Sequence, residues 1–368
     1  MGKFMMNKDS LYIIYGDKAK YMVLKVLEDI NIVKDIPAKD SKIGIKPNLV
    51  LAKPAESGAT TSPELVEGLI EYLLSHGFKN ITILEGSWVG DRTSRAFDVC
   101  GYTDISKKYN IPLVDLQKDK YTDYHVKGIN LSLCNKIMEL DYLINMPVLK
   151  GHCQTNITCA LKNLKGCIPD KEKRRFHTMG LHKPIAYLNK ALKQDLIIVD
   201  GLIGDLNFEE GGNPVQMNRV IVGKDPVMVD SYVAQLLGYH VEEIPYITIS
   251  EDINIGNFVS DDNVIELNKD NTPMTIPKSR LVERLDSYVE ENNACSACYG
   301  SLIHSLDRLN DMGYLNRMKE EIYIGQAYKG KTHHGIGIGV CTRDFTKSLK
   351  GCPPKAKDII EFLIKENR

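Results

Sequence analysis

Four cysteines near the end of the chain have a spacing that suits metal binding. Cys295 and Cys298 form a C-x2-C pair in the segment NNACSACYGSL, and Cys341 and Cys352 follow at longer intervals. The short loop of a C-x2-C pair lets both thiolates face one metal centre, and two further cysteines can complete its coordination. Four thiolates can hold either one zinc ion or one four-iron, four-sulfur (4Fe–4S) cluster.

Two features favour the cluster. The segment HHGIGIGVC is rich in glycine, which lets backbone amides approach and hydrogen-bond inorganic sulfide. A Cys-Pro step, here Cys352-Pro353, also follows a cluster cysteine in bacterial ferredoxins. We therefore expect one 4Fe–4S cluster held by Cys295, Cys298, Cys341 and Cys352, with zinc as the alternative cofactor. A metal-free interpretation also stays open, in which the four thiols are simply buried in a small core.

A second group of polar residues follows predicted strands earlier in the chain. Lys46 and Asn48 end the strand of KIGIKPNLV, and Glu85 ends that of NITILEGS, where an apolar core gives no reason for them. Thr61 and Ser62 precede Pro63, so we expect Ser62 to be the N-cap of a helix. A helix start offers free backbone amides to an anion. The alternative is that these residues only cap the helix.

The segment LINMPVLKGHCQTNITCALKNLKGCIPDKEKRRFH contains the densest set of cationic and titratable residues. We expect its buried strand LINMPVL to deliver Lys150 and His152 to the strand end. Cationic side chains there can neutralise a phosphate or carboxylate, and an imidazole can move a proton. A solvated basic loop is the alternative, but the apolar residues between the charges favour a partly buried anion site.

These strand ends make up one predicted substrate site for a small anion. Its candidate substrate-binding residues are Lys46, Asn48, Thr61, Ser62, Lys150, Lys162, Asn163 and Lys165. Its candidate catalytic residues are Glu85, His152, His177 and Asp200, of which Glu85 and Asp200 are possible bases at strand ends. No GxGxxG or GxxxxGK[ST] motif occurs in a suitable context, so neither a dinucleotide site nor a P-loop is indicated.

The elements that must position these residues alternate between strands and helices. From KIGIKPNLV to PVMVDSYVAQLLG, this rhythm predicts an α/β fold with a mainly parallel sheet covered by helices on both faces. In such sheets, ligands bind beyond the carboxyl ends of the strands. Near residue 270 the polar segment NKDNTPMTIPKS predicts a boundary between an α/β domain, 1–270, and a smaller four-cysteine iron–sulfur domain, 271–368. RLVERLDSYVEENN then predicts a helix that leads to Cys295.

Composition narrows the class of protein. The 368 residues include 47 Lys and Arg against 48 Asp and Glu, so no overall charge steers the chain toward nucleic acid or a membrane. The N-terminus is too short and polar for a signal peptide, and no apolar run approaches the ~20 residues of a membrane span. We expect a cytoplasmic protein, in which thiols stay reduced. Cys153, Cys159 and Cys167 do not share one helical face, and we expect them in the core or near the site.

Several segments resemble a known family. KPNLV, TTSPELVEGLIEYLLSHG, ILEGS, INMPVLKGH, TNITCALKNLKGCIPDKEKRRFH, IIVDGL and GKDPVMVD are similar in type and order to the "domain of unknown function 362" family of bacterial and archaeal proteins, over about residues 40 to 240. The resemblance implies the α/β fold and an association with iron–sulfur clusters, often in an attached ferredoxin-like segment. This chain lacks the C-x2-C-x2-C-x3-C-P run of two-cluster ferredoxins, so at most one cluster is implied. It also has DLNFEEGGNP where a fuller Gly-Pro pattern is expected after VDGLIG.

Taken together, we predict a cytoplasmic iron–sulfur redox enzyme that acts on a small anionic metabolite with an electron-donor protein as partner. One alternative is an electron-transfer or binding protein without its own catalysis. Another is a non-redox enzyme with a structural metal site. These alternatives differ in whether the cysteine cluster lies within electron-transfer reach of the basic site, which local sequence patterns do not reveal.

Overall fold

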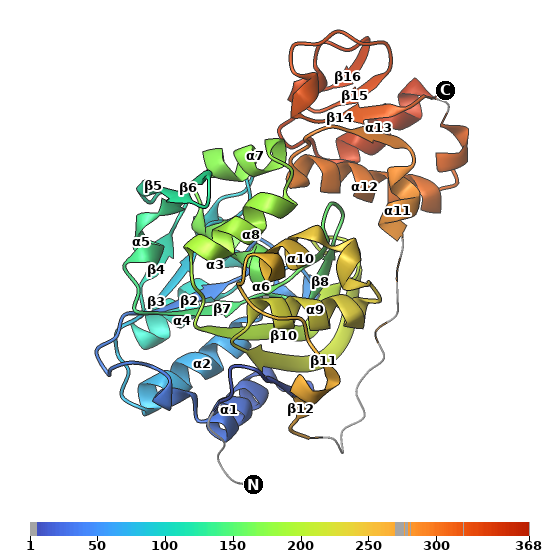
Figure 1. Ribbon diagram of the computed structural model, residues 1–368. Coiled ribbons are helices and arrows are strands. Elements are labelled where there is room, and N and C mark those ends of the chain that lie inside the picture. Colours follow the sequence, from blue (N-terminus) through green and yellow to red (C-terminus); the bar gives the residue numbers. More distant parts are fainter. Residues whose placement is uncertain (1–5, 269–275, 277–278, 280, 319, 368) are drawn as a thin grey trace.

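The computed structural model describes residues 6–268, 276, 279, 281–318 and 320–367 (Figure 1). Within these residues, eight strands form one sheet in the order β12 (Val264–Glu266), β1 (Leu11–Tyr15), β11 (Pro214–Gly223), β10 (Leu196–Asp205), β7 (Tyr142–Met146), β2 (Ile43–Pro47), β3 (Ile81–Glu85) and β4 (Leu113–Asp115). From β10 to β4 all neighbouring strands are parallel. The predicted α/β class with a mainly parallel sheet is confirmed.

Strand β11 is the exception, because it runs antiparallel to both β10 and β1. A loop of residues 206–213 joins β10 directly to β11. Since this loop contains no crossover helix, the two strands form a hairpin and must be antiparallel. The acidic segment NFEEGG therefore belongs to a hairpin connection.

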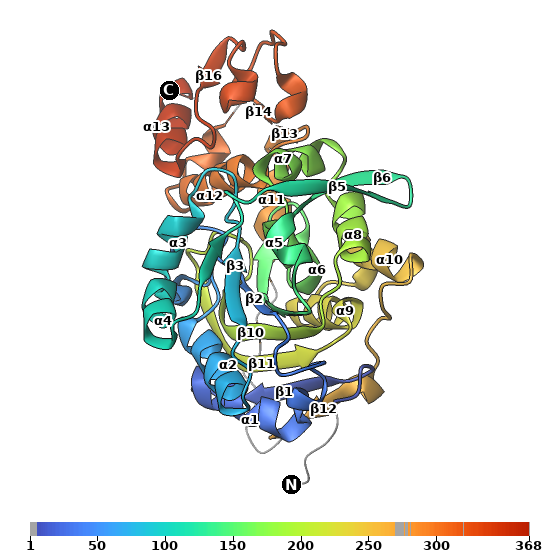
Figure 2. The same cartoon turned by 90° about the vertical axis from the view of Figure 1, so that its left-hand side faces the viewer.

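Helices cover both faces of the sheet, as Figures 1 and 2 show. Successive strand residues point to opposite faces, so Ile198 lies in one apolar core while Ile197 and Val199 lie in the other. The first core is covered by α1 (Ala19–Ile30), α2 (Pro63–Ser75), α3 (Thr93–Val99) and α4 (Tyr102–Tyr109). The second is covered by α5 (Asn135–Met138), α6 (Ala160–Asn163), α7 (Asp170–Thr178), α8 (His182–Ala191), α9 (Pro226–Leu237) and α10 (Pro245–Asp252). The segment TSRAFDVCGYTDISKKYN forms two separate helices, because Gly101 adopts a φ of 81° between α3 and α4.

The strand predicted over LINMPVL is shorter than expected. β7 ends at Met146, and Pro147 follows, which has no N–H to donate to a neighbouring strand. Lys150 and His152 lie instead on β8 (Lys150–His152), which pairs antiparallel with β9 (Asn156–Thr158). A second small hairpin is formed by β5 (Tyr121–Val126) and β6 (Ile129–Cys134).

The C-terminal part of the described chain has its own sheet and its own apolar core. β13 (Val289–Glu291), β14 (Ile322–Ile324), β15 (Ile336–Ile338) and β16 (Lys347–Leu349) form a sheet in which all neighbours are parallel. α11 (Leu281–Asp286), α12 (Ser296–Asp311) and α13 (Ala356–Glu366) pack around it, at the top of Figure 1. The helix predicted over RLVERLDSYVEENN ends at Asp286, and β13 precedes Cys295. The predicted boundary at residue 270 lies outside the described residues.

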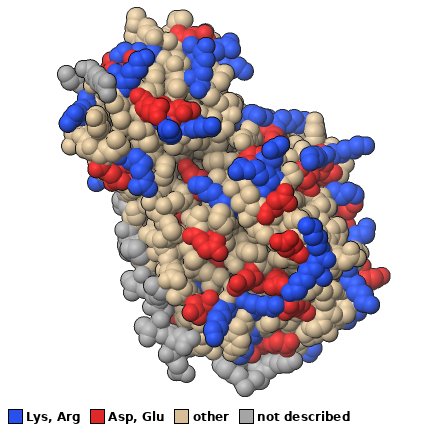
Figure 3. Space-filling model, turned by 180° about the vertical axis from the view of Figure 1, so that it is seen from behind, with Lys and Arg blue, Asp and Glu red and all other residues tan. Residues whose placement is uncertain are grey.

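Acidic and basic side chains are interspersed over one face of the molecule (Figure 3), which agrees with a formal net charge of -1. Within the described residues, no helix combines the length and the apolar character needed to cross a bilayer.

Candidate functional site

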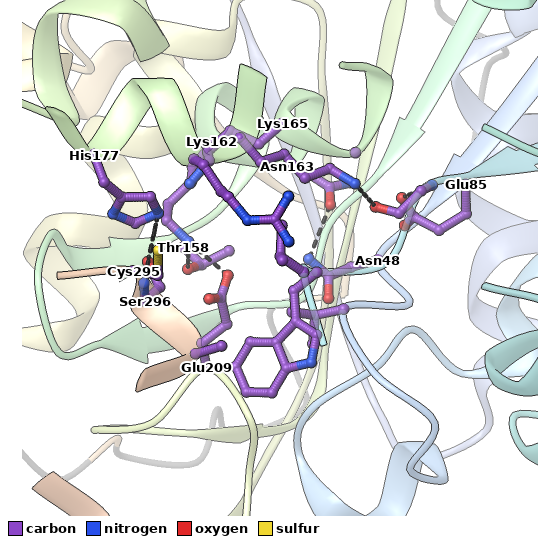
Figure 4. Close-up of a pocket in the computed structure, with 18 of the residues that line it drawn as sticks. Asn48, Glu85, Thr158, Lys162, Asn163, Lys165, His177, Glu209, Cys295 and Ser296 are labelled. Carbon is purple, nitrogen blue, oxygen red and sulfur yellow. Dashed lines mark hydrogen bonds and ion pairs between the residues drawn. The ribbon is translucent and has the colours of Figure 1, made fainter. Parts of the chain in front are cut away.

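A cavity lies beyond the carboxyl ends of β2 and β3, where the large sheet meets the C-terminal part of the chain (Figure 4). Its volume is about 70 Å³, several times the ~10–15 Å³ that one water molecule requires. Its wall consists of Lys46, Asn48, Val50, Glu85, Gly86, Trp88, Val89, Thr158, Lys162, Asn163, Lys165, Gly166, Lys173, Arg174, His177, Glu209, Cys295, Ser296 and Ala297. Many of the predicted site residues are therefore brought together at one sheet edge.

A buried ion pair forms the base of this cavity. Lys46 Nζ lies 2.8 Å from Glu85 Oε2, and both side chains are almost fully buried. Glu85 also accepts hydrogen bonds from the backbone nitrogens of Leu49 and Gly86 at 2.8 and 2.7 Å. These donors hold both oxygens of the carboxylate in place. Glu85 is thus better suited to fixing Lys46 than to abstracting a proton from a substrate.

The opposite wall is built on Glu209, which the sequence analysis did not select. Its carboxylate contacts Lys162 Nζ at 2.5 Å and His152 Nε2 at 3.1 Å. Burial alone raises the pKa of Glu209, but Lys162 and His152 outweigh burial and hold that pKa well below its usual range. The only pattern that could have pointed to this residue is the pair of glutamates in the loop NFEEGG between two strands.

His152 is neutral and structural in this arrangement. Burial, together with the charge of Lys162, lowers the pKa of His152 to about 4. Its Nδ1 accepts hydrogen bonds from the backbone nitrogens of Gln154 and Thr155 at 2.9 and 3.2 Å. The Nε2 therefore bears the proton and donates to Glu209. His152 shapes the β8–β9 turn and does not line the cavity.

Two cations of the cavity wall have no protein partner among the described residues. Neither the ammonium of Lys165 nor the guanidinium of Arg174 makes a hydrogen bond or ion pair there, whereas Lys173 donates to the carbonyl of Ser87 at 2.7 Å. Burial, followed by the charge of Lys162, lowers the pKa of Lys165 to about 7. An anion that enters the cavity can receive charge-assisted hydrogen bonds from both free groups.

His177 joins the cavity to the C-terminal part of the chain. It is 7% exposed, and its Nε2 lies 3.5 Å from the backbone nitrogen and from the Oγ of Ser296. Its Nδ1 is buried and has no hydrogen-bond partner in the described structure. Burial, with a contribution from Lys165, lowers the pKa of His177 well below its usual range. The imidazole is therefore neutral.

The four C-terminal cysteines gather at the carboxyl edge of the small sheet. Cys295 follows β13, and Cys298 lies one turn further along in α12. Cys341 and Cys352 follow β15 and β16, whose register pairs Ile338 with Leu349 and continues through the hydrogen bond from Val340 N to Gly351 O at 3.0 Å. This register places Cys341 beside Cys352.

The thiols also act on one another electrostatically. Burial raises the pKa of Cys295 to about 11, with further contributions from Cys341 and Cys352. Burial likewise raises the pKa of Cys298, and the other three thiols add to the shift. In the described part of the chain, no three His, Cys, Asp or Glu side chains are arranged to hold one metal ion. A 4Fe–4S cluster does not require such a group, because each of its cysteines binds a different iron atom. The donor set and its common sheet edge fit a cluster.

Other predicted site residues lie outside the cavity wall. Ser62 is the N-cap residue of α2 but makes no side-chain cap. Its backbone nitrogen donates instead to Asp200 Oδ2 at 2.7 Å, so a protein carboxylate occupies the helix start that was predicted to receive an anion. Burial raises the pKa of Asp200 to about 6. Thr61 Oγ1 donates to Met146 O at 2.7 Å. These residues connect α2 to the sheet.

Lys150 is also a structural residue. Its side chain is fully buried, and its Nζ donates to Asn48 Oδ1, Ala59 O and Glu209 O at 3.1, 2.5 and 2.8 Å. Three acceptors use all three N–H groups of an ammonium. The basic segment is therefore not a solvated loop, but Lys150 has no donor left for a ligand.

Three further cysteines lie in the apolar cores, and one side of the cavity is apolar. Cys153, Cys159 and Cys167 are buried in the apolar cores, as predicted. Trp88, the single tryptophan of the chain, gives the cavity an apolar side together with Val50 and Val89. No recognisable motif marks Trp88, which lies in the loop after β3, or Lys173, which lies in α7.

Three comparisons show which known proteins this chain is similar to. The chain is 25% identical over 228 residues to thylakoid-associated protein sll1697 of Synechocystis sp., which covers 58% of this chain and 68% of that protein. A likeness to the structure of the lactate racemase apoprotein from Thermoanaerobacterium thermosaccharolyticum has a TM-score of 0.42 and 14% identity, and covers 66% of this chain and 60% of that chain. The family model described as "Domain of unknown function (DUF362)" matches residues 43–235, more than half of the 368 residues. This chain therefore belongs to the DUF362 family.

Proposed function

We propose that this protein is an iron–sulfur redox enzyme that acts on a small anionic metabolite. The observation that carries the proposal is that Cys295, one of the four gathered cysteines, lines the same cavity as the free cations Lys165 and Arg174. A cluster bound to Cys295 would border the cavity that receives the anion, so electron transfer between the two would have a short path.

The cluster part of the proposal rests on the donor set. Four thiols reach one edge of a parallel sheet from three different strand ends, and the spacing C-x2-C allows Cys295 and Cys298 to bind neighbouring positions. Iron–sulfur clusters prefer soft thiolate ligands of this kind. When bound, a 4Fe–4S cluster supplies one-electron transfer.

The protein's own residues would then divide the remaining tasks. Lys165 and Arg174 bind the anionic group of the substrate, while Trp88 contacts its apolar part and restricts water. The ion pairs Lys46–Glu85 and Lys162–Glu209 are buried in the wall and fix its polar groups in position. The neutral imidazole of His177 lines the cavity and can exchange a proton with the substrate.

Anaerobic purification tests the cluster. Protein made without oxygen should be brown, with broad visible absorption that bleaches on reduction, and should contain about four iron and four sulfide per chain. Colourless protein with stoichiometric zinc and no sulfide would reject the redox function, because zinc has no accessible second oxidation state.

A metabolite screen tests the anion site. Phosphorylated and carboxylated metabolites should be tested for thermal stabilisation of the wild-type protein, and hits should be repeated with Lys165→Ala and Arg174→Ala. Loss of stabilisation in both variants supports the site. If both variants are stabilised as strongly as the wild-type protein, the ligand binds elsewhere.

A further inference from the structure

The two ends of the proposed cluster site face different environments. Cys295 lines the substrate cavity, whereas Cys352 is exposed and Cys341 is partly exposed. Because Cys341 and Cys352 lie side by side after β15 and β16, a cluster held by the four cysteines would have one side toward the cavity and another toward solvent. With such a cluster in place, electrons could enter or leave the protein at the Cys352 side without passing through the cavity.

The surface around Cys352 is rich in positive charge. The segment 326–356 contains six Lys and Arg residues but one Asp, in a chain whose charges otherwise nearly cancel. Lys350 and Lys355 flank Cys352 and are exposed, and Lys329 is exposed and acts electrostatically on Cys341. Within the described structure, these three ammonium groups have neither a hydrogen bond nor an ion pair with the protein. They are free to attract a partner of opposite charge.

We propose that Lys329, Lys350 and Lys355 form a docking surface for a small acidic protein that carries single electrons. The inference rests on the proposed cluster. A reduced carrier docked over Cys352 would give up one electron and be oxidised, a cluster held by the four cysteines would gain that electron, and no covalent bond would change. Complementary charge accelerates such an encounter 10- to 10³-fold at low salt. An electron-transfer complex also needs only a small interface, which this exposed edge can provide.

Stopped-flow spectroscopy tests the surface with a reduced acidic plant-type ferredoxin as the probe. In the double variant Lys350→Glu and Lys355→Glu, the rate of cluster bleaching should fall at least tenfold at low ionic strength. The matched control is Lys79→Glu with Lys107→Glu, two exposed lysines on the large domain, which changes the net charge equally and should leave the rate unaltered. At ~1 M salt, where the Debye length is about 3 Å, the rates of all three proteins should converge.

Two further readouts separate this inference from the proposed function. Carbodiimide coupling joins carboxylates of the probe to nearby lysines, and mass spectrometry should find the cross-links at Lys329, Lys350 or Lys355. Cross-links confined to the large domain, or equal rates for both double variants at low salt, would overturn the docking surface while leaving the cluster intact. Absence of iron and sulfide from the wild-type protein would instead reject the proposed function and this inference with it.

Discussion

The ammonium of Lys162 lies 2.5 Å from the carboxylate of Glu209, and only 3% and 10% of the two side chains are exposed. Removing one partner of such a pair leaves the other charge buried without compensation. Glu209→Gln should therefore lower the free energy of unfolding by about 3–5 kcal/mol, measured by urea denaturation. The neighbouring Glu210 is the control, since burial raises its pKa to about 7 and the cost of its ionised form favours a neutral side chain. Equal losses for Glu209→Gln and Glu210→Gln would contradict this assignment.

Gly166 allows the Lys46–Glu85 pair to form. A Cβ at this position would lie 2.1 Å from Glu85 Oε1 and 2.7 Å from Lys46 Nζ. Gly166→Ala should thus displace the pair and lower stability by about 1–3 kcal/mol. Gly77→Ala is the spatial control, because a Cβ there meets nothing within 4 Å, although its φ of +84° adds some backbone strain of its own. An unchanged anion affinity in Gly166→Ala would show that the pair does not shape the site.

The pKa of about 7 at Lys165 makes anion binding depend on pH. The amine must be protonated to bind an anion, so affinity should be greatest below pH 7 and decrease above it, by at most about tenfold per pH unit. Titration calorimetry with sulfate is a direct measurement, since sulfate does not change its charge in this range. Lys165→Arg keeps a positive charge and should remove the dependence. A wild-type affinity that stays constant from pH 6 to 8.5 would exclude Lys165 from the anion site.

Lys150 and Arg174 should respond differently to substitution. Lys150→Met removes a buried ammonium from three acceptors, so we expect stability to fall by at least ~2 kcal/mol, because unsatisfied buried acceptors cost about 1–3 kcal/mol each. Arg174 is exposed and unpaired in the described structure. Arg174→Ala should keep stability within about 0.5 kcal/mol of wild type and weaken sulfate binding about tenfold. A loss of stability in Arg174→Ala together with a loss of only sulfate binding in Lys150→Met would contradict the roles assigned to these two residues.

Replacement of the C-terminal cysteines should separate metal ligands from core thiols. Cys298→Ser and Cys352→Ser should each lose most of the iron and sulfide, and the C-terminal region should become more sensitive to protease, because a bound cluster connects three strand ends. Cys100→Ser is the control, since Cys100 packs in the apolar core of the large sheet. Full iron content in both ligand variants would show that the iron is bound elsewhere.

Local sequence patterns were sufficient for much of the fold. The alternation of apolar strands with amphipathic helices predicted the mainly parallel sheet. The spacing of apolar residues along each strand or helix indicates which of its side chains face the core. The same logic located Lys46, Asn48 and Glu85, since the carboxyl ends of parallel strands share an edge. Cys295 and Cys298 were recognisable from a spacing of three residues, which any short loop can bring together.

Only the tertiary structure decided what these residues do. Glu209 neutralises the charge of Lys162, although the two residues are 47 positions apart in the sequence. Ser296 Oγ donates a hydrogen bond to Gln154 Oε1 across 142 positions. No local period encodes such contacts, because they depend on how separate elements pack after each has formed. For the same reason the sequence could not show that Lys150 donates its N–H groups to protein oxygens or that Asp200 accepts a hydrogen bond at the start of α2. Nor could it show that Cys295 borders the cavity. The sequence alone gives the types of the functional residues. Whether their polar groups are bonded to the protein or free to bind a ligand depends on long-range packing and desolvation.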